Sequence, residues 1–245
     1  MSDEKTVVCA TSPQTQADNI LKYTEHRDKL LQKAENLVLN EFPTTIQQLN
    51  STLLALNLQV KTASDICQPL NLPAIEEDQQ DDKSSGECKT KRTPLKVNLP
   101  CNRNVEELIQ TIKPHVIKLI YDSNLMAIWI NLMIPRIEDG NNFGVEIQEN
   151  VLSDVISVHD DACGYYSRFS RYYSGRAKLV SKVIKYPAII DYRKSIDEMD
   201  EKEYFQLSLI LEKIRNKYTF LHDLIRKNLD KLKKPRTSND NQFLY

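Results

Sequence analysis

Residues 200–232 read DEKEYFQLSLILEKIRNKYTFLHDLIRKNLDKL, and their apolar side chains recur at alternating steps of three and four. That spacing forms one apolar stripe along a helix and is typical of antiparallel bundles and coiled coils. We therefore predict a long helix that begins near Asp200, with Glu203 three residues later as a capping partner. The stripe consists of Tyr204, Leu207, Leu211, Ile214, Tyr218, Leu221, Ile225, Asn228 and Leu232.

Two segments upstream follow the same pattern. One helix is expected to begin near Val145, and only Arg176 interrupts its apolar stripe. Another is expected from about Asn102 to Ile134, with Asn104 and Glu107 as its N-terminal capping pair. The stripe of the later helix consists of Val151, Val155, Val158, Ala162, Tyr165, Phe169, Tyr172, Arg176, Leu179 and Val183.

The remaining helical pattern covers residues 15–67. Pro43 lies inside it and lacks the amide hydrogen that a helix needs, so a kink or break is expected near Phe42. No strand pattern competes anywhere in the chain. The predicted fold class is therefore all-α, an elongated four-helix bundle.

Composition predicts how the chain is divided around these helices. Residues 1–14 are expected to be disordered. Residues 68–100 contain four prolines and an acidic run, which leave too little apolar surface to offset chain entropy. They are predicted to form a flexible insert between the first two helices. The bundle continues over residues 101–236, with a connecting turn at 135–144, and residues 237–245 form a polar tail.

The overall charge excludes several classes of partner. The chain has 245 residues, of which 33 are basic and 34 acidic, for a net charge of −1. This balance favours neither nucleic acid nor a membrane surface, and no apolar run is long enough to cross a bilayer. The five cysteines are scattered without a C-x-x-C pair, which fits a reducing intracellular compartment.

The turn between the second and third helices has an unusual composition. Residues 134–145 read IPRIEDGNNFGV and hold two of the chain's five glycines. Glycine and asparagine enter the left-handed backbone region at low cost. A plain connection between helices does not need so many of them, so we predict a tight, well-defined turn that itself contacts a partner.

Two sets of side chains have the chemistry of a catalytic or metal site, and each has a plainer explanation. His159 and Cys163 could form a nucleophile pair or half a metal site, but no second pair of ligands accompanies them. Glu138 and Asp139 could act as an acid–base pair, but helix capping and solvation explain carboxylates in a turn. No phosphate-binding, dinucleotide or zinc motif occurs. We therefore predict no catalytic residues, no metal, no cofactor and no enzymatic activity.

Two charged residues of the third helix, a basic cluster in the insert and the C-terminal tail remain. Arg176 stands where the stripe predicts an apolar residue, so it faces a channel or a neighbouring subunit, together with Lys178, unless the phase of the stripe is wrong. The insert carries Lys89, Lys91 and Arg92, which form a weak nuclear-import signal or a chance cluster. The polar tail ends in three apolar residues and a carboxylate, which suits capture in a partner's pocket. These residues are Phe243, Leu244 and Tyr245.

Together these segments resemble the 11S (REG) proteasome activators, and most strongly the gamma-type subunits. Residues 134–145 match that family's activation loop essentially residue for residue. The other matching segments are SRYY at 170–173, RAKLVSK at 176–182, DEMDEKEY at 197–204, residues 222–236 and the final Leu244-Tyr245.

The resemblance implies a ring that docks on the 20S proteasome α-ring without ATP or ubiquitin. Seven copies of this chain are expected in the ring, with unfolded peptides or small proteins as cargo and the nucleus, besides the cytoplasm, as location. Phe243, Leu244 and Tyr245 would dock the tail, and the activation loop would open the gate. The alternative is an oligomeric helical scaffold with no protease-activating role. The implied loop residues are Glu138, Asp139, Gly140, Asn141, Asn142, Phe143 and Gly144.

Overall fold

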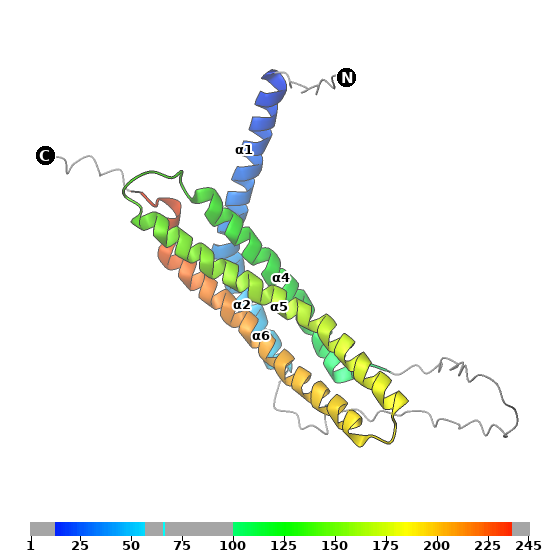
Figure 1. The fold of residues 1–245 in the computed structure, drawn as a ribbon. Helices are drawn as coiled ribbons and strands as arrows, with labels where there is room; N and C mark the ends of the chain where they lie inside the picture. Colours follow the sequence, from blue (N-terminus) through cyan, green and yellow to red (C-terminus); the bar gives the residue numbers. More distant parts are fainter. Residues whose placement is uncertain (1–12, 57–65, 67–99, 237–245) are drawn as a thin grey trace, which may run out of the picture.

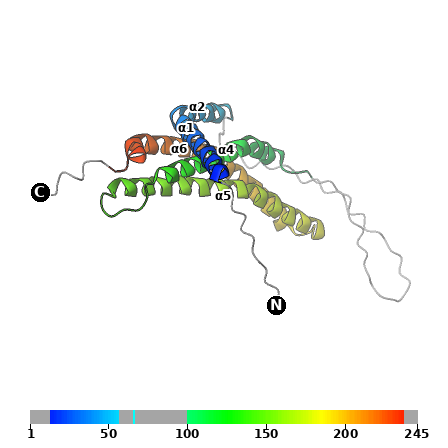
Figure 2. The ribbon, with the colours of Figure 1, turned by 90° about the horizontal axis from the view of Figure 1, so that it is seen from above.

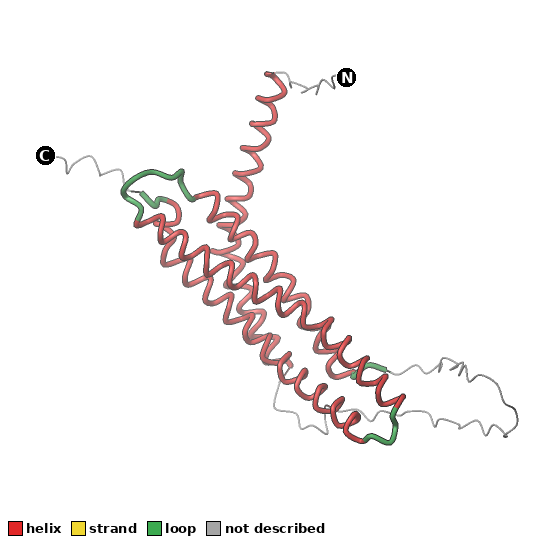
Figure 3. Tube along the Cα trace, viewed as in Figure 1, coloured by secondary structure: helices red, strands yellow, loops and turns green. Residues whose placement is uncertain are grey.

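The computed structural model describes residues 13–56, 66 and 100–236. Their elements are α1 (Pro13–Asn36), a π-helical segment η1 (Leu37–Glu41), α2 (Phe42–Leu56), α4 (Arg103–Met133), α5 (Phe143–Lys185) and α6 (Ile190–Lys233). These described residues contain no strand, and the connections from α4 to α5 and from α5 to α6 are short (Figure 3). The predicted all-α fold class is confirmed.

The long helices α4, α5 and α6 lie side by side and form the body of an elongated bundle (Figure 1). Each of them contacts the other two, and α2 packs mainly on α6. The bundle therefore has four helical positions, as predicted, with α2 in the fourth. α1 leaves the bundle and projects away from it (Figures 1 and 2).

The core consists of the apolar stripes that the sequence predicts. Trp129, Phe42 and Tyr218 are its largest fully buried side chains, and the rings of Phe42 and Tyr218 meet edge to face at 5.1 Å between centroids. Burial and the adjacent carboxylate of Asp122 raise the pKa of the Tyr218 phenol. Its hydroxyl therefore stays protonated and donates a 2.7 Å hydrogen bond to Asp122 Oδ2.

The first helix is interrupted as expected from Pro43. Pro43 has no N–H to donate to the carbonyl four residues before it, and η1 lies directly upstream, where the N–H of Phe42 bonds to the carbonyl of Leu37. The wider π turn lets the chain change direction between α1 and α2. α1 begins at Pro13, two residues before the expected start, because proline suits the first position of a helix.

The predicted start of α4 is one residue from the observed start, but its cap is a different residue. Asn102, rather than Asn104, is the N-cap, and its side chain accepts a 3.3 Å hydrogen bond from the Val105 N–H. The Asn104 amide donates to the carbonyl of Ile66 at 3.2 Å. The helix continues through Pro114 for 31 residues. It is long and apolar enough to cross a membrane, but ten of its side chains are buried in the bundle, as in a core helix.

The start of α6 was predicted too late in the chain. The helix begins at Ile190, after the turn that contains Pro187, and not near Asp200. Asp200 and Glu203 are not capping residues, because both lie inside the helix with buried side chains. Only Ile196 is a buried apolar residue in the first ten positions, so the apolar period is too weak there to mark the helix.

A buried ion pair explains the charged residue in the stripe of α5. Arg176 is 7% exposed, and its Nε donates to both carboxylate oxygens of Asp200, at 3.0 and 3.2 Å. Asp200 also accepts hydrogen bonds from the Tyr172 hydroxyl at 2.9 Å and the Asn102 amide at 2.9 Å. The prediction that Arg176 faces a channel or a neighbouring subunit is therefore wrong. The stripe has the predicted phase, and the charge is neutralised inside the bundle.

The same network holds both flanks of the insert. Asn102 donates to the carbonyl of Ile66 at 3.0 Å, and Arg176 Nη1 donates to the carbonyl of Pro100 at 3.4 Å. The segment 67–99 between these flanks lies outside the described residues, so its predicted character is untested. Nearby, Arg168 binds Glu203 through two bonds of 2.8 and 2.7 Å. These fixed ion pairs set the register of α5 against α6.

The buried network predicts that Arg176 and Lys178, which are two positions apart, contribute very differently to the free energy of unfolding. Arg176→Leu leaves the Asp200 carboxylate buried without its counter-charge, which costs about 3–5 kcal/mol in the free energy of unfolding. Lys178 is exposed and makes no ion pair with the described residues, so Lys178→Leu should change stability by no more than about 0.5 kcal/mol. Urea denaturation at one fixed protein concentration measures the free energy of unfolding of both variants. An equal loss of stability in the two variants would contradict the assignment of Arg176 to the core.

Candidate functional site

Three helix ends and a turn meet at one end of the bundle. α4 and α6 end there, α5 begins there, and residues 134–142 connect α4 to α5 (Figure 1). Residues 234–236, called the chain exit below, follow α6 at this end. The flanks of the insert lie near the start of α4, which is roughly 45 Å away along a helix of this length. The turn and the chain exit therefore share one face of the molecule.

The turn has the backbone geometry that its composition predicts. Gly140 has φ +84° and Asn141 has φ +45°, and Asn141 is the one non-glycine residue with positive φ in the described part of the chain. The Ile134 N–H closes the end of α4 on the Ile130 carbonyl at 3.1 Å. Asn142 precedes α5, and its amide donates to the Glu138 carbonyl at 3.2 Å. The predicted tight turn is confirmed at the left-handed positions.

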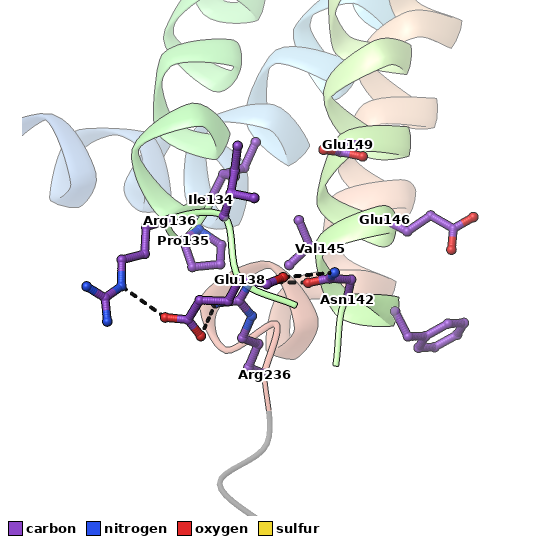
Figure 4. Close-up of a pocket in the computed structure, with 11 residues that line it drawn as sticks. Ile134, Pro135, Arg136, Glu138, Asn142, Val145, Glu146, Glu149 and Arg236 are labelled. Carbon is purple, nitrogen blue, oxygen red and sulfur yellow. Dashed lines mark hydrogen bonds and ion pairs between the residues drawn. The ribbon is translucent and has the colours of Figure 1, made fainter. Parts of the chain in front are cut away.

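Arg236 links this turn to the chain exit. Its Nη1 donates to Glu138 Oε2 at 2.8 Å and its Nη2 donates to Asn142 Oδ1 at 3.2 Å (Figure 4). The other carboxylate oxygen of Glu138 accepts from Arg136 Nε at 2.9 Å. Glu138 therefore lies between two guanidinium groups, one within the turn and one at the base of the tail. Glu138 and Asp139 are both exposed, and Glu138 serves as a structural acceptor.

Two close contacts hold the chain exit on the start of α5. Gln148 is fully buried, and its amide donates to the carbonyls of Leu232 at 2.7 Å and Met133 at 3.1 Å. It thereby satisfies one free carbonyl at the end of each neighbouring helix. Gly144 is buried against the Pro235 backbone, and a Cβ there would lie 2.7 Å from the Pro235 Cα. Only glycine permits this approach.

Apolar side chains project from the same face. Ile137 is fully exposed and Phe143 is 70% exposed. They help to line an open hollow of about 540 Å³ beside the turn, together with Pro135, Val145 and Arg236 (Figure 4). Exposed apolar groups around a rigid turn are a feature of protein contact surfaces.

The His159–Cys163 pair is separate from this end. The Cys163 sulfur lies 3.9 Å from both ring nitrogens of His159, midway along α5. Within the described residues, no group of three or more His, Cys, Asp or Glu side chains could hold a metal ion. The pair agrees with the interpretation of two partly buried residues on one helical face.

Some of the predicted site residues cannot be placed. Lys89, Lys91 and Arg92, like Phe243, Leu244 and Tyr245, lie outside the described residues and stay predictions. Sequence reasoning missed Gln148, although it continues the stripe of Val151 and Val155 upstream as a polar residue at a core position. It also missed the Arg236 contacts, because no local pattern joins residues 98 positions apart.

The fold and this end define a helical-bundle protein that presents a rigid turn beside its own chain exit. The chain belongs to the proteasome activator PA28 family: the family's C-terminal model matches residues 98–242 and its N-terminal model matches residues 17–77. The human protein named proteasome activator complex subunit 3 is 39% identical over 237 residues, which cover 89% of this chain and 93% of that protein. The chicken protein of that name is 38% identical with the same coverage. These relatives are named as activators, in agreement with the prediction of a regulator rather than an enzyme.

Solved structures show the same architecture. The 11S subunit of the Plasmodium falciparum proteasome, PA28, superimposes with a TM-score of 0.69 at 29% identity, over 92% of this chain and 94% of that one. The PA26 activator from a complex with an archaeal 20S proteasome has a TM-score of 0.57 at 14% identity, over 94% and 98%. The second similarity concerns the fold alone.

Two glycine substitutions distinguish the effect of losing the Gly144–Pro235 contact from the effect of backbone strain in the turn. Gly144→Ala forces the Pro235 backbone away from α5, so amide hydrogen exchange should rise in residues 229–236. Gly140→Ala only strains a left-handed residue, with no atom within 4 Å of the new methyl group, at a cost of roughly 1–2 kcal/mol. Exchange in residues 229–236 should then stay unchanged. Unchanged exchange in both variants would show that the close approach does not hold the chain exit.

Proposed function

We propose that this chain activates the 20S proteasome without ATP or ubiquitin, as a ring that docks through its tails and opens the gate with its activation loop, residues 135–144. The observation that carries the proposal is the meeting of a rigid turn and the chain exit on one face of the bundle. A partner that binds residues 237–245 is thereby brought against the turn. Family membership supports the same function.

The tails are proposed to act through multivalency. A single tail of nine residues binds weakly, because ordering it costs entropy. Seven tails on a homoheptameric ring raise the effective concentration of each after the first has bound. Modest contacts by Phe243, Leu244 and Tyr245 then give firm docking.

The energy needed at the gate is small for each subunit. Moving a two-state gate from 1:99 to 99:1 open requires about 5.5 kcal/mol of differential affinity. Divided among seven loops, this is roughly 0.8 kcal/mol each, comparable to one net hydrogen bond. The loop must hold one shape, since a partner's equilibrium shifts only through contacts that differ between its two states. The hydrogen-bonded turn at Gly140 and Asn141 meets that condition.

The exposed apolar side chains at this end also support contact with the proteasome there. Ile137 and Phe143 flank the turn and have few neighbours in the isolated chain. The flanks of the insert, Ile66 and Pro100, are held at the opposite end of α4. The insert is therefore proposed to face away from the proteasome, toward the side from which unfolded peptides or small proteins would enter.

A peptide-hydrolysis assay distinguishes this function from that of a helical scaffold. Latent 20S proteasome is mixed with the purified protein and a short fluorogenic peptide, without nucleotide. An activator raises the hydrolysis rate. A mass measurement on the purified protein alone gives the ring size. A rate that stays at the latent level would leave the scaffold as the function.

The turn is tested by Asn141→Tyr. A bulky side chain is strained at φ +45°, so the turn loses its shape while the tail and the helices are kept. We expect a normal ring that co-sediments with the proteasome but gives little or no stimulation. Asn150→Tyr, at an exposed position within α5, is the matched control and should stimulate normally. Full stimulation by Asn141→Tyr would refute the role of the loop.

The tail is tested by deletion of Leu244 and Tyr245. The deletion removes the terminal apolar contacts, so we expect the ring mass to be unchanged and co-sedimentation with the proteasome to be lost. Asp240→Ala is the control, because it changes the tail while keeping its last three residues. Persistent co-sedimentation of the shortened protein would refute docking through the tail.

A further inference from the structure

We propose that Arg236 is a positioning residue that couples docking of the tail to the shape of the activation loop. The proposal rests on the proposed function, because it concerns how that function is transmitted. Arg236 lies three positions beyond the end of α6 and directly precedes the tail in sequence. Its side chain therefore joins the start of the tail to the turn.

The contacts of Arg236 enclose the strained part of the turn. Its guanidinium bonds Glu138 on one side of Gly140 and Asn141, and Asn142 on the other. Asn142 in turn donates to the Glu138 carbonyl, so the three residues form a closed ring of hydrogen bonds around the left-handed pair. A planar guanidinium suits this task, because its donors diverge in a fixed fork.

The fold itself does not depend on this bond. Gln148, Leu232 and the Gly144–Pro235 contact already hold the end of α6 on α5. The Glu138 side chain is 47% exposed, and the Arg236 side chain is 20% exposed. Because the Glu138 carboxylate is nearly half exposed, water screens the pair and limits its contribution to stability. The contact therefore does more to fix the loop relative to the tail than to stabilise the bundle.

Repetition around the ring amplifies the effect of the bond. Suppose that without it each loop holds the productive shape about half of the time. Over seven subunits the open-to-closed ratio then falls by about 2⁷, or roughly 100-fold, from about 99:1 to about 1:1. Maximal stimulation would be about halved. The apparent affinity for the proteasome would also fall, by roughly 50-fold, because the contacts that favour the open gate also contribute to binding.

The chain offers a matched control for the experiment. Arg136 bonds the other oxygen of the same carboxylate, but it belongs to the turn and is 88% exposed. Arg136→Gln removes one charge and one bond from Glu138 without touching the link to the tail. Arg236→Lys keeps the charge but has no fork to hold Glu138 and Asn142 together, so an intermediate result is expected.

The test compares Arg236→Gln, Arg236→Lys and Arg136→Gln with the unmodified protein. We measure half-saturation of proteasome binding, stimulation at saturation, ring mass, melting temperature and hydrogen exchange of residues 138–142. For Arg236→Gln we expect unchanged ring mass and melting temperature, half-saturation at a roughly 50-fold higher concentration, about half the maximal stimulation, and faster exchange in the turn. Arg136→Gln should match the unmodified protein in every measurement.

Three results would overturn the proposal. They are full stimulation at saturation by Arg236→Gln, unchanged exchange of residues 138–142 in that variant, or an equal fall in stimulation for Arg136→Gln. Failure of the unmodified protein to stimulate the proteasome would instead overturn the proposed function. The exchange of residues 138–142 would still report whether Arg236 holds the turn, so the two failures are distinguishable.

Discussion

The close approach of Pro235 to Gly144 is the contact on which the functional end of this molecule depends. It brings the chain exit against the first turn of α5, and the buried Gln148 amide secures the same junction by bonding carbonyls in the last turns of α4 and α6. With the exit fixed there, Arg236 reaches the connecting turn. A glycine, a buried amide and a guanidinium thus join three helix ends into one rigid face.

The opposite half of the bundle is fixed by buried charge. Arg176 and Asp200 form an ion pair whose remaining hydrogen-bonding capacity is used by Tyr172, Asn102 and the Pro100 carbonyl. Burial and the neighbouring carboxylate raise the pKa of the Tyr172 phenol, so its hydroxyl remains a donor. Apolar stripes can slip by one turn at modest cost, but a buried ion pair allows a single register. The network therefore aligns α5 with α6 and places their other ends correctly.

The sequence predicted the fold well because bundle helices bury regular stripes, and the period of these stripes is visible in one dimension. It also predicted the left-handed turn at Gly140 and Asn141, since those residue types carry a backbone preference of their own. It could not pair Arg176 with Asp200 or Arg236 with Glu138, because their partners lie 24 and 98 positions away. The sequence also suggests Asp200 as a helix cap, because a carboxylate next to apolar residues has the same local pattern whether it caps a helix or pairs with a buried cation.

In the proposed complex, the end of the bundle with the turn and the chain exit faces the proteasome. An electron cryomicroscopy map of this protein bound to the 20S proteasome would show whether it does. We expect density for residues 134–144 against the α-ring, with the chain exit beside it and the start of α4 far from the contact. A map in which the start of α4 meets the α-ring, or in which the turn contacts nothing, would contradict it.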